Sequence, residues 1–232
     1  MKRKIALFIF FFILLFALVV EARTLNVAYV LRVPRNPDRE FLSVFNQGFP
    51  NGRYNITLIN DDDVRRTDFS KYDLLFVGDD DNKLKNFQYI PVGDMPSIVA
   101  NTFHADDWGL SQEVSLVAAS EPLEVLVVGN GVKKVYNTCC VGGSGENLPI
   151  YYLIENYKAP DFHNVAITNI GDLKEGVIQT MEAGGRLLNG KHADGRICFY
   201  GITQTRYLTN DAKNLFKDCV EYVRDAIGEF RC

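Results

Sequence analysis

Three side chains capable of acid–base or metal chemistry follow one another closely after an apolar run of the sequence. They are His104, Asp106 and Asp107. An imidazole beside a carboxylate can act as a general base or as a metal ligand, because the carboxylate orients the ring and favours its charged form. In the competing interpretation His104 is a loop residue that is hydrogen-bonded to the backbone, while Trp108 and Leu110 anchor the loop on the sheet.

Aspartates also follow the two preceding strand candidates, at residues 61–63 and 79–81. The carboxyl ends of parallel strands meet at one edge of a sheet, so these carboxylates together with Asp106 and Asp107 could share Ca²⁺ or Mg²⁺. The candidate metal ligands are Asp79, Asp106 and Asp107. The sequence lacks the D-x-D-x-D-G spacing of an ordered cation loop. We therefore favour aspartates that form turns and stay solvated, with no cofactor, and keep a divalent cation as the alternative.

A second polar group, formed by Thr203, Gln204 and Arg206, precedes the last predicted helix. Backbone amides at a helix N-terminus can hold an anionic or hydroxylated ligand. The interpretation that we prefer is that these three are loop residues capping the helix. The full predicted ligand-binding set comprises Asp79, Asp80, His104, Asp107, Thr203, Gln204 and Arg206.

Apolar runs rich in β-branched and aromatic residues predict the strands that position these groups. They cover residues 25–31, 54–59, 73–78, 97–102, 113–118, 123–129, 164–169, 176–188 and 196–201. Residues 36–47 predict a helix, because Phe41, Val44 and Phe45 recur at helical spacing. Wholly apolar runs such as 73–78 are typical of strands covered on both faces. The alternation of strand and helix predicts an α/β domain with a doubly wound, mostly parallel sheet and helices on both faces.

The last helix is predicted to begin after Thr209, which can cap its N-terminus. Its apolar stripe consists of Leu215, Phe216, Cys219, Val220, Val223, Ala226 and Ile227. Because Cys219 lies on this stripe, we expect it to be a buried core thiol.

The N-terminus has the layout of an export signal. Three basic residues precede sixteen apolar ones at residues 5–20, and Ala22 offers a small residue at the usual cleavage spacing. As a helix this run spans about 24 Å, less than the roughly 30 Å of a bilayer core, which favours cleavage over a short membrane anchor. We expect residues 1–22 to be a signal peptide and residues 23–232 to form a single domain that is secreted or held at the cell surface. Contact with the membrane is expected only through the N-terminal segment.

The exported part is mildly acidic. Loss of residues 1–22 removes three basic residues and one acidic residue, so the formal net charge moves from −4 to −6. No basic stripe interleaved with aromatic residues remains, which argues against a nucleic-acid partner. The expected partner is a surface ligand, either a carbohydrate or a protein.

The five cysteines form an odd set, so at least one is free or bonded to another molecule if the others pair. A disulfide-linked oligomer is therefore one expected form. The adjacent Cys139 and Cys140 precede a glycine-rich run, where backbone amides could lower the pKa of a nucleophilic thiol. Exported thiols oxidise readily, so we favour disulfides for this pair.

The C-terminal segment GGRLLNGKHADGRICFYGITQTRYLTNDAKNLFKDCVEYV (residues 184–223) and the order of predicted strands resemble the class I glutamine-amidotransferase-like superfamily. They are most similar to its ThuA-like and β-galactosidase-trimerisation-like branches. The resemblance covers most of the exported chain and implies a flavodoxin-like fold. In catalytic members a cysteine follows a central strand and a histidine follows a late strand. Here residues 103–105, after the central strand, contain no cysteine, and residues 202–205, after the late strand, contain no histidine. The resemblance therefore implies the fold of a pseudoenzyme.

A shorter stretch, HADDWGLS (residues 104–111), resembles the N-A-D-D-F-G-L-S motif of YdjC-type carbohydrate deacetylases. In that family one aspartate of the motif binds a divalent metal and its neighbour assists in activating water. The resemblance implies these roles for Asp106 and Asp107.

The sequence thus predicts an exported, non-catalytic domain that acts in ligand binding or surface assembly. The alternative is a metal-dependent carbohydrate hydrolase or deacetylase that uses His104, Asp106 and Asp107.

Overall fold

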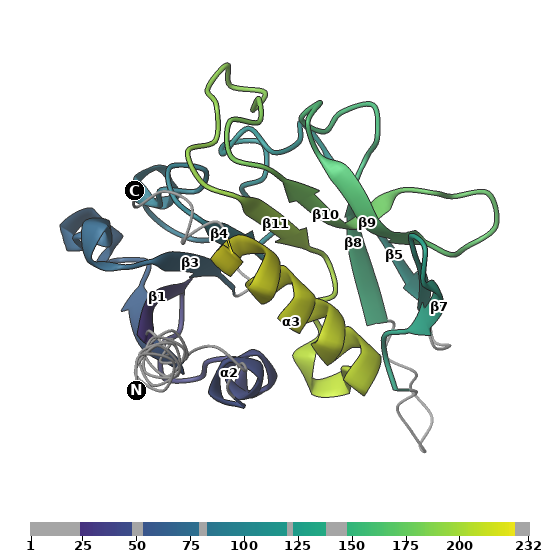
Figure 1. Cartoon of the computed structure of the whole chain (residues 1–232), viewed down its shortest axis with the longest axis horizontal. Coiled ribbons are helices and arrows are strands. Elements are labelled where there is room, and N and C mark those ends of the chain that lie inside the picture. The colour runs from purple at the N-terminus through teal and green to yellow at the C-terminus, as the bar shows by residue number, and fades with distance from the viewer. Residues whose placement is uncertain (1–23, 48–52, 79–82, 120–122, 138–147, 226–232) are drawn as a thin grey trace, which may run out of the picture.

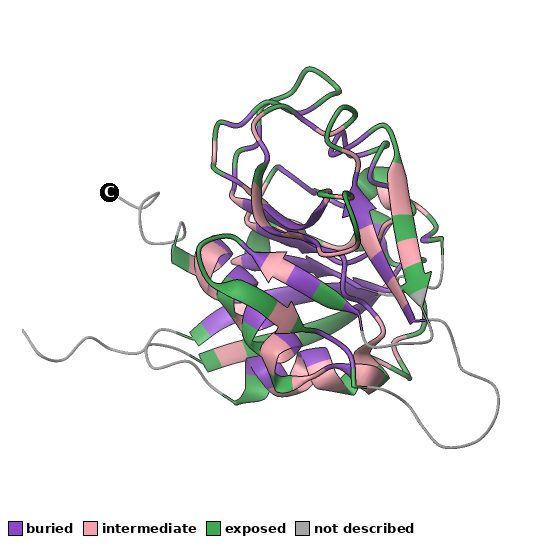
Figure 2. Ribbon diagram, turned by 90° about the vertical axis from the view of Figure 1, so that its right-hand side faces the viewer, coloured by how far each residue is buried: buried purple, intermediate pink, exposed green. Residues whose placement is uncertain are grey.

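A computed structural model describes residues 24–47, 53–78, 83–119, 123–137 and 148–225. Within these ranges the chain forms a sheet of eleven strands in the order β2-β1-β3-β4-β11-β10-β9-β6-β7, with β8 pairing both β5 and β10. The sheet runs through the middle of the molecule, and many of the buried residues lie on its strands (Figures 1 and 2). The predicted α/β class is confirmed.

The first five strands of this order form a parallel half. Their bounds are Arg53–Asn60 for β2, Thr24–Leu31 for β1, Leu74–Val77 for β3, Ser97–Val99 for β4 and Ile197–Tyr200 for β11. Each is parallel to its neighbours within this half. Every residue of β3 and β4 is buried, as the apolar runs predict.

The remaining strands form an antiparallel half, so the sheet is mixed. Their bounds are Gly176–Met181 for β10, His163–Thr168 for β9, Glu124–Val127 for β6, Gly131–Lys134 for β7, Leu148–Leu153 for β8 and Val114–Ala119 for β5. All pairings among them, and that of β10 with β11, are antiparallel. The expectation of a mostly parallel sheet holds only for the first half. A parallel crossover needs a dozen or more residues, whereas β6 and β7 are joined by a short turn through Gly129 and Gly131 at positive φ.

Both described α-helices pack on one face of the sheet. They are α2 (Arg39–Asn46) and α3 (Asn210–Asp225). Phe216 of α3 lies at the centre of this core, with its ring centroid 4.4 Å from that of Phe41 and 5.3 Å from that of Phe76. Thr209 caps α3 as predicted, because its Oγ1 accepts a hydrogen bond of 3.1 Å from the backbone N–H of Ala212.

The opposite face is covered by loops and three 3₁₀ helices, Val64–Arg66, Phe69–Lys71 and Phe87–Tyr89. The predicted arrangement with α-helices on both faces is thus not seen in the described part of the chain. In the connection from β3 to β4, Pro91, Gly93 at φ 86° and Pro96 interrupt helical backbone. The predicted strand 176–188 ends at Met181, and residues 182–196 form a long loop above this face.

A disulfide between Cys198 and Cys219 joins β11 to α3, and their Cα atoms lie 5.8 Å apart. Cys219 is buried in the core as expected, but it is not a free thiol, because β11 places a second buried cysteine directly beneath the helix. The expected nucleophile or disulfide pair Cys139 and Cys140, and Cys232, lie outside the described residues.

None of the helices in the described ranges combines the length and apolar composition that a membrane span requires. The predicted signal peptide, residues 1–22, lies outside those ranges.

Candidate functional site

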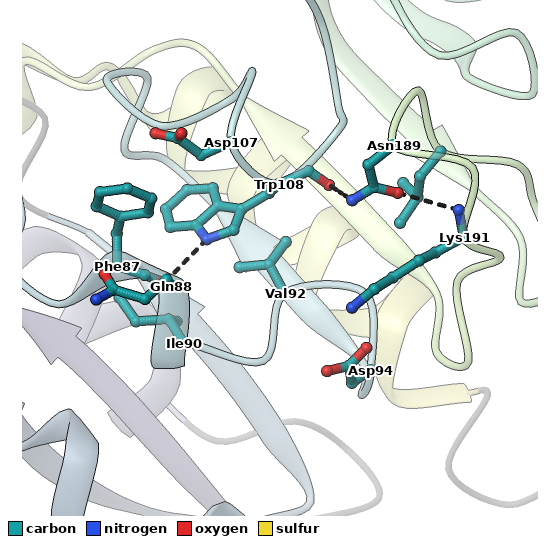
Figure 3. Close-up of a pocket in the computed structure, with 10 residues that line it drawn as sticks. Phe87, Gln88, Ile90, Val92, Asp94, Asp107, Trp108, Asn189 and Lys191 are labelled. Atoms are coloured by element: carbon teal, nitrogen blue, oxygen red, sulfur yellow. Dashed lines mark hydrogen bonds between the residues drawn. The ribbon is translucent and has the colours of Figure 1, made fainter.

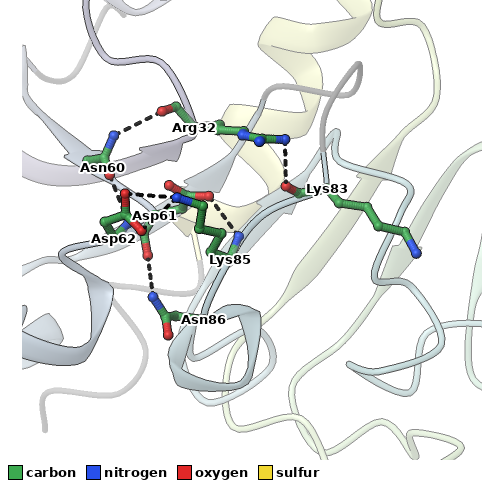
Figure 4. A network of polar contacts seen from close by, with 7 residues as sticks. All are labelled: Arg32, Asn60, Asp61, Asp62, Lys83, Lys85 and Asn86. Atoms are coloured by element: carbon green, nitrogen blue, oxygen red, sulfur yellow. Dashed lines mark hydrogen bonds and ion pairs between the residues drawn. The ribbon is translucent and has the colours of Figure 1, made fainter.

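The first group of aspartates, after β2, has a structural role (Figure 4). Asp61 is buried, and its carboxylate accepts a hydrogen bond of 2.7 Å from the backbone N–H of Lys85. The Lys85 ammonium lies 3.1 Å from the carboxylate of Asp62. Asn86 donates a hydrogen bond of 3.2 Å to the backbone carbonyl of Asp61. These contacts fasten residues 83–86 to the end of β2, which agrees with aspartates that form turns.

The divalent cation considered for the edge of the sheet would also need ligands from the second group of aspartates, residues 79–81. Asp79 and Asp80 lie outside the described residues, so their part in a ligand rim stays a prediction. In the ranges that the structure describes, no group of three or more His, Cys, Asp or Glu side chains is arranged to hold a metal ion.

The loop after β4 brings His104 and Asp107 together. The imidazole Nδ1 lies 2.9 Å from Asp107 Oδ2, and the ring stacks on Phe87 with centroids 4.1 Å apart. The loop turns back on itself, since the backbone N–H of Trp108 donates to the carbonyl of His104. Asp106 is exposed, and its side chain does not join this pair.

Trp108 and Leu110 anchor this loop, as the competing interpretation predicts. Only 5% of Trp108 and none of Leu110 is exposed, and both belong to the core on the face opposite α2 and α3. The indole Nε1–H donates a hydrogen bond of 3.3 Å to the backbone carbonyl of Phe87. His104 itself is bonded to a carboxylate and not to the backbone.

Beside Trp108 the surface opens into a cleft of about 180 Å³ (Figure 3). Three connections far apart in the sequence build it: the β3–β4 segment, the β4–β5 loop and the β10–β11 loop. Its lining consists of Phe87, Gln88, Ile90, Val92, Asp94, Asp107, Trp108, Leu187, Asn189 and Lys191. Asp107 is the one predicted site residue in this lining. We call this feature the Trp108 cleft.

Asn189 ties the β10–β11 loop to the Trp108 loop. Its Nδ2 donates a hydrogen bond of 3.4 Å to the backbone carbonyl of Trp108, and its Oδ1 accepts one of 3.1 Å from the backbone N–H of Lys191. The polar part of the lining, formed by Gln88, Asp94, Asn189 and Lys191, was not predicted from the sequence. The run Asn189-Gly190-Lys191 predicts a turn, but nothing in the sequence indicates that this turn meets a loop 81 residues earlier.

Gly109 permits this close approach, and we expect Gly109→Ala to disturb it. Gly109 has φ 75°, and a Cβ there would lie 2.9 Å from Asn189 Cγ and 3.0 Å from the Asn189 backbone nitrogen. Strain together with this clash is expected to lower the free energy of unfolding by about 2 kcal/mol, measured by chemical denaturation.

Gly129→Ala is the matched control, because Gly129 has the same φ of 75° but no atom within 4 Å of the added Cβ. It should cost about 1 kcal/mol, which isolates backbone strain. Equal losses in the two variants would show that contact with Asn189 is unimportant.

The polar group predicted before the last helix lies on the face covered by α2 and α3, away from the Trp108 cleft. It consists of Thr203, Gln204 and Arg206. Thr203 is buried, and the backbone N–H of Gln204 donates a hydrogen bond of 3.3 Å to the Tyr136 hydroxyl. The Arg206 guanidinium lies over the Tyr207 ring. Helix capping falls to Thr209 and not to these three residues. The structure therefore does not unite Thr203, Gln204 and Arg206 with His104 and Asp107.

Asp38 is a further residue near this group that sequence reasoning missed. Its two carboxylate oxygens accept hydrogen bonds from Thr205 Oγ1 at 2.9 Å and from the Tyr29 hydroxyl at 3.4 Å. The position of Asp38 directly before α2 was a sequence sign of a turn or cap, but it did not reveal these long-range partners.

The fold and the cleft define an α/β domain with a mixed sheet and a lateral surface site. No model of a known protein family and no curated protein sequence matches the chain. The solved structures that are similar to it include two that share 12% sequence identity with the chain. A ThuA-like protein from Parabacteroides merdae aligns over 87% of this chain and 90% of its own, with a TM-score of 0.45. The D-alanine–D-alanine ligase from Bacillus anthracis in complex with ATP aligns over 90% of this chain and 98% of its own, with a TM-score of 0.31.

Proposed function

We propose that residues 23–232 form an exported, non-catalytic binding domain, that its parallel half derives from a glutamine-amidotransferase-like, flavodoxin-like sheet, and that its ligand is a carbohydrate held in the Trp108 cleft. The observation that carries the proposal is the composition of the cleft lining. Apolar side chains, among them Trp108 and Leu187, form one part of it, while amide, carboxylate and ammonium groups form the rest.

A sugar ring matches such a lining, because it presents C–H faces to apolar groups and hydroxyls to donors and acceptors. Gln88 and Asn189 carry both donors and acceptors, Asp94 and Asp107 accept, and Lys191 donates. The cleft is smaller than the roughly 300–1,000 Å³ of pockets that enclose a drug-sized ligand. It therefore suits one unit of a glycan whose remainder stays in solvent.

Two features support export. The N-terminal segment has the charge and length of a signal peptide. The disulfide between Cys198 and Cys219 belongs to the oxidising compartments outside the cytoplasm.

The alternative enzyme, a metal-dependent carbohydrate deacetylase, has one supporting observation, the contact of 2.9 Å between His104 and Asp107. That contact involves one nitrogen of a buried imidazole, and Asp106 is exposed and takes no part in it. We favour the binding domain over the deacetylase because Asp106 does not join His104 and Asp107 in one group. Metal analysis together with a deacetylase assay on N-acetylated oligosaccharides separates the two functions, and activity that is lost in Asp106→Asn would establish the enzyme.

Calorimetric titration with cellobiose, N,N′-diacetylchitobiose and maltose tests the binding function. We expect at least one of them to bind, and Gln88→Ala and Lys191→Ala each to weaken that binding about tenfold, the usual value of one lost hydrogen bond. Both side chains are exposed, so neither change should alter folding.

Asn130→Ala and Lys134→Ala are matched controls, because both residues are exposed on the antiparallel half, away from the cleft. They should bind as the wild type does. Binding that is unaffected by Gln88→Ala and Lys191→Ala, or absent for all three disaccharides, would refute a carbohydrate site at this position.

A further inference from the structure

His104 is a buried polar side chain with only half of its hydrogen-bonding capacity in use. Its side chain is 6% exposed and lies against the rings of Phe87 and Trp108. Nδ1 contacts Asp107, while Nε2 is buried and has no hydrogen-bond partner. A buried polar atom without a partner requires a physical reason.

The contact with Asp107 decides which nitrogen carries the proton. An ionised carboxylate only accepts hydrogen bonds, so Nδ1 must be the donor across the 2.9 Å. The contact therefore requires a proton on Nδ1 of His104.

The same contact fixes the carboxylate at the rim of the Trp108 cleft. Asp107 is 38% exposed at its side chain and belongs to the cleft lining beside Phe87 and Trp108 (Figure 3). His104 Nδ1 donates to Asp107 Oδ2, and no described residue donates a hydrogen bond to Asp107 Oδ1. With Oδ2 held, Oδ1 is a preoriented acceptor for a donor group of a ligand.

We infer that His104 is a positioning residue that holds Asp107 as the hydroxyl-accepting group of the Trp108 cleft. The inference rests on the proposed carbohydrate site. It assigns Asp107 to a hydroxyl of the sugar and His104 to the orientation of that carboxylate, without contact between the imidazole and the sugar. The stack of His104 on Phe87 holds the imidazole itself in place.

Nitrogen NMR of the purified, ¹⁵N-labelled protein tests the positioning without any ligand. Long-range ¹H–¹⁵N correlation should show one histidine that carries a proton on Nδ1, and His104→Phe should remove that pattern while those of His163 and His192 remain. Asp107→Ala should abolish the preference for Nδ1. An imidazole protonated only on Nε2, or unaffected by Asp107→Ala, would overturn the inference.

Titration of the variants with cellobiose and N,N′-diacetylchitobiose tests the consequence for binding. His104→Asn keeps an N–H donor near the position of Nδ1, whereas His104→Phe keeps the ring stacked on Phe87 and loses the donor. We expect His104→Phe to bind about tenfold more weakly and His104→Asn to restore most of the affinity. Asn130→Ala, exposed on the antiparallel half and away from the cleft, is the control and should bind as the wild type does.

The two experiments separate two kinds of failure. A wild-type protein that shows the Nδ1-protonated histidine but binds no disaccharide refutes the carbohydrate site. A wild-type protein that binds, together with equal affinities for wild type and His104→Phe, refutes the positioning role. Equal losses in His104→Phe and His104→Asn, with lowered thermal midpoints in both, would also refute it, because they indicate a purely structural histidine.

Discussion

Replacement of Trp108 by alanine is expected to lower the free energy of unfolding by about 3 to 5 kcal/mol and to abolish binding in the Trp108 cleft. The indole is almost wholly buried in the core on the face opposite α2 and α3, and its Nε1–H donates a hydrogen bond to the carbonyl of Phe87. Its removal leaves a cavity on the face where no described α-helix packs. Denaturation followed by circular dichroism measures the effect, since Trp108 is the single tryptophan of the chain.

Trp108→Phe is the matched variant, because it keeps an aromatic ring but loses the Nε1–H donor. We expect a loss of about 1 to 2 kcal/mol and partial retention of binding. If Trp108→Ala unfolded at the same denaturant concentration as the wild type, the indole would not be the anchor of the loop. The cleft built on it would then lose its main support.

Removal of the disulfide is expected to have the second large effect. The double variant Cys198→Ala, Cys219→Ala should lose about 3 kcal/mol of unfolding free energy, because the bond closes a loop with a sequence separation of 21 residues. The double variant is preferable to either single one, which would leave an unpaired thiol in the core. Chemical denaturation with and without a reducing agent measures the change.

The reducing agent supplies the internal control for this prediction. It should destabilise the wild type more than the double variant, which lacks this bond but keeps Cys139, Cys140 and Cys232. Wild-type protein whose stability does not respond to the reductant, or whose Cys198 and Cys219 are both alkylated without reduction, would contradict a disulfide. It would also remove one of the two supports for export, because such bonds persist mainly outside the cytoplasm.

Several elements followed from local sequence patterns. The apolar runs around Val27 and Phe76 predicted β1 and β3, and the helical spacing of Phe41, Val44 and Phe45 predicted α2. Thr209 and the stripe behind it predicted the start and the buried face of α3. These features depend on residues a few positions apart, whose periodicity is written directly in the chain.

The candidate site was predicted only in part, because one part lies within a single loop and the other depends on contacts between distant segments. The sequence placed His104, Asp107 and Trp108 in one loop, and the structure keeps them together. It did not indicate that Asn189, 81 residues away from Trp108, would meet this loop through the space left by Gly109. Nor did it reveal that Thr203 and Gln204, although also behind a strand of the parallel half, lie on the other face.

The sequence by itself determined the local elements and the loop that carries His104 and Trp108, because neighbouring residues and their spacing encode both of these. The tertiary structure alone decided three things: the antiparallel direction of β10, the pairing of Cys198 with Cys219, and the cleft between three distant connections. Each of these depends on which strand edge or loop meets which. That choice follows from the packing of the whole sheet, since residues far apart in the chain carry no mark of their eventual neighbours.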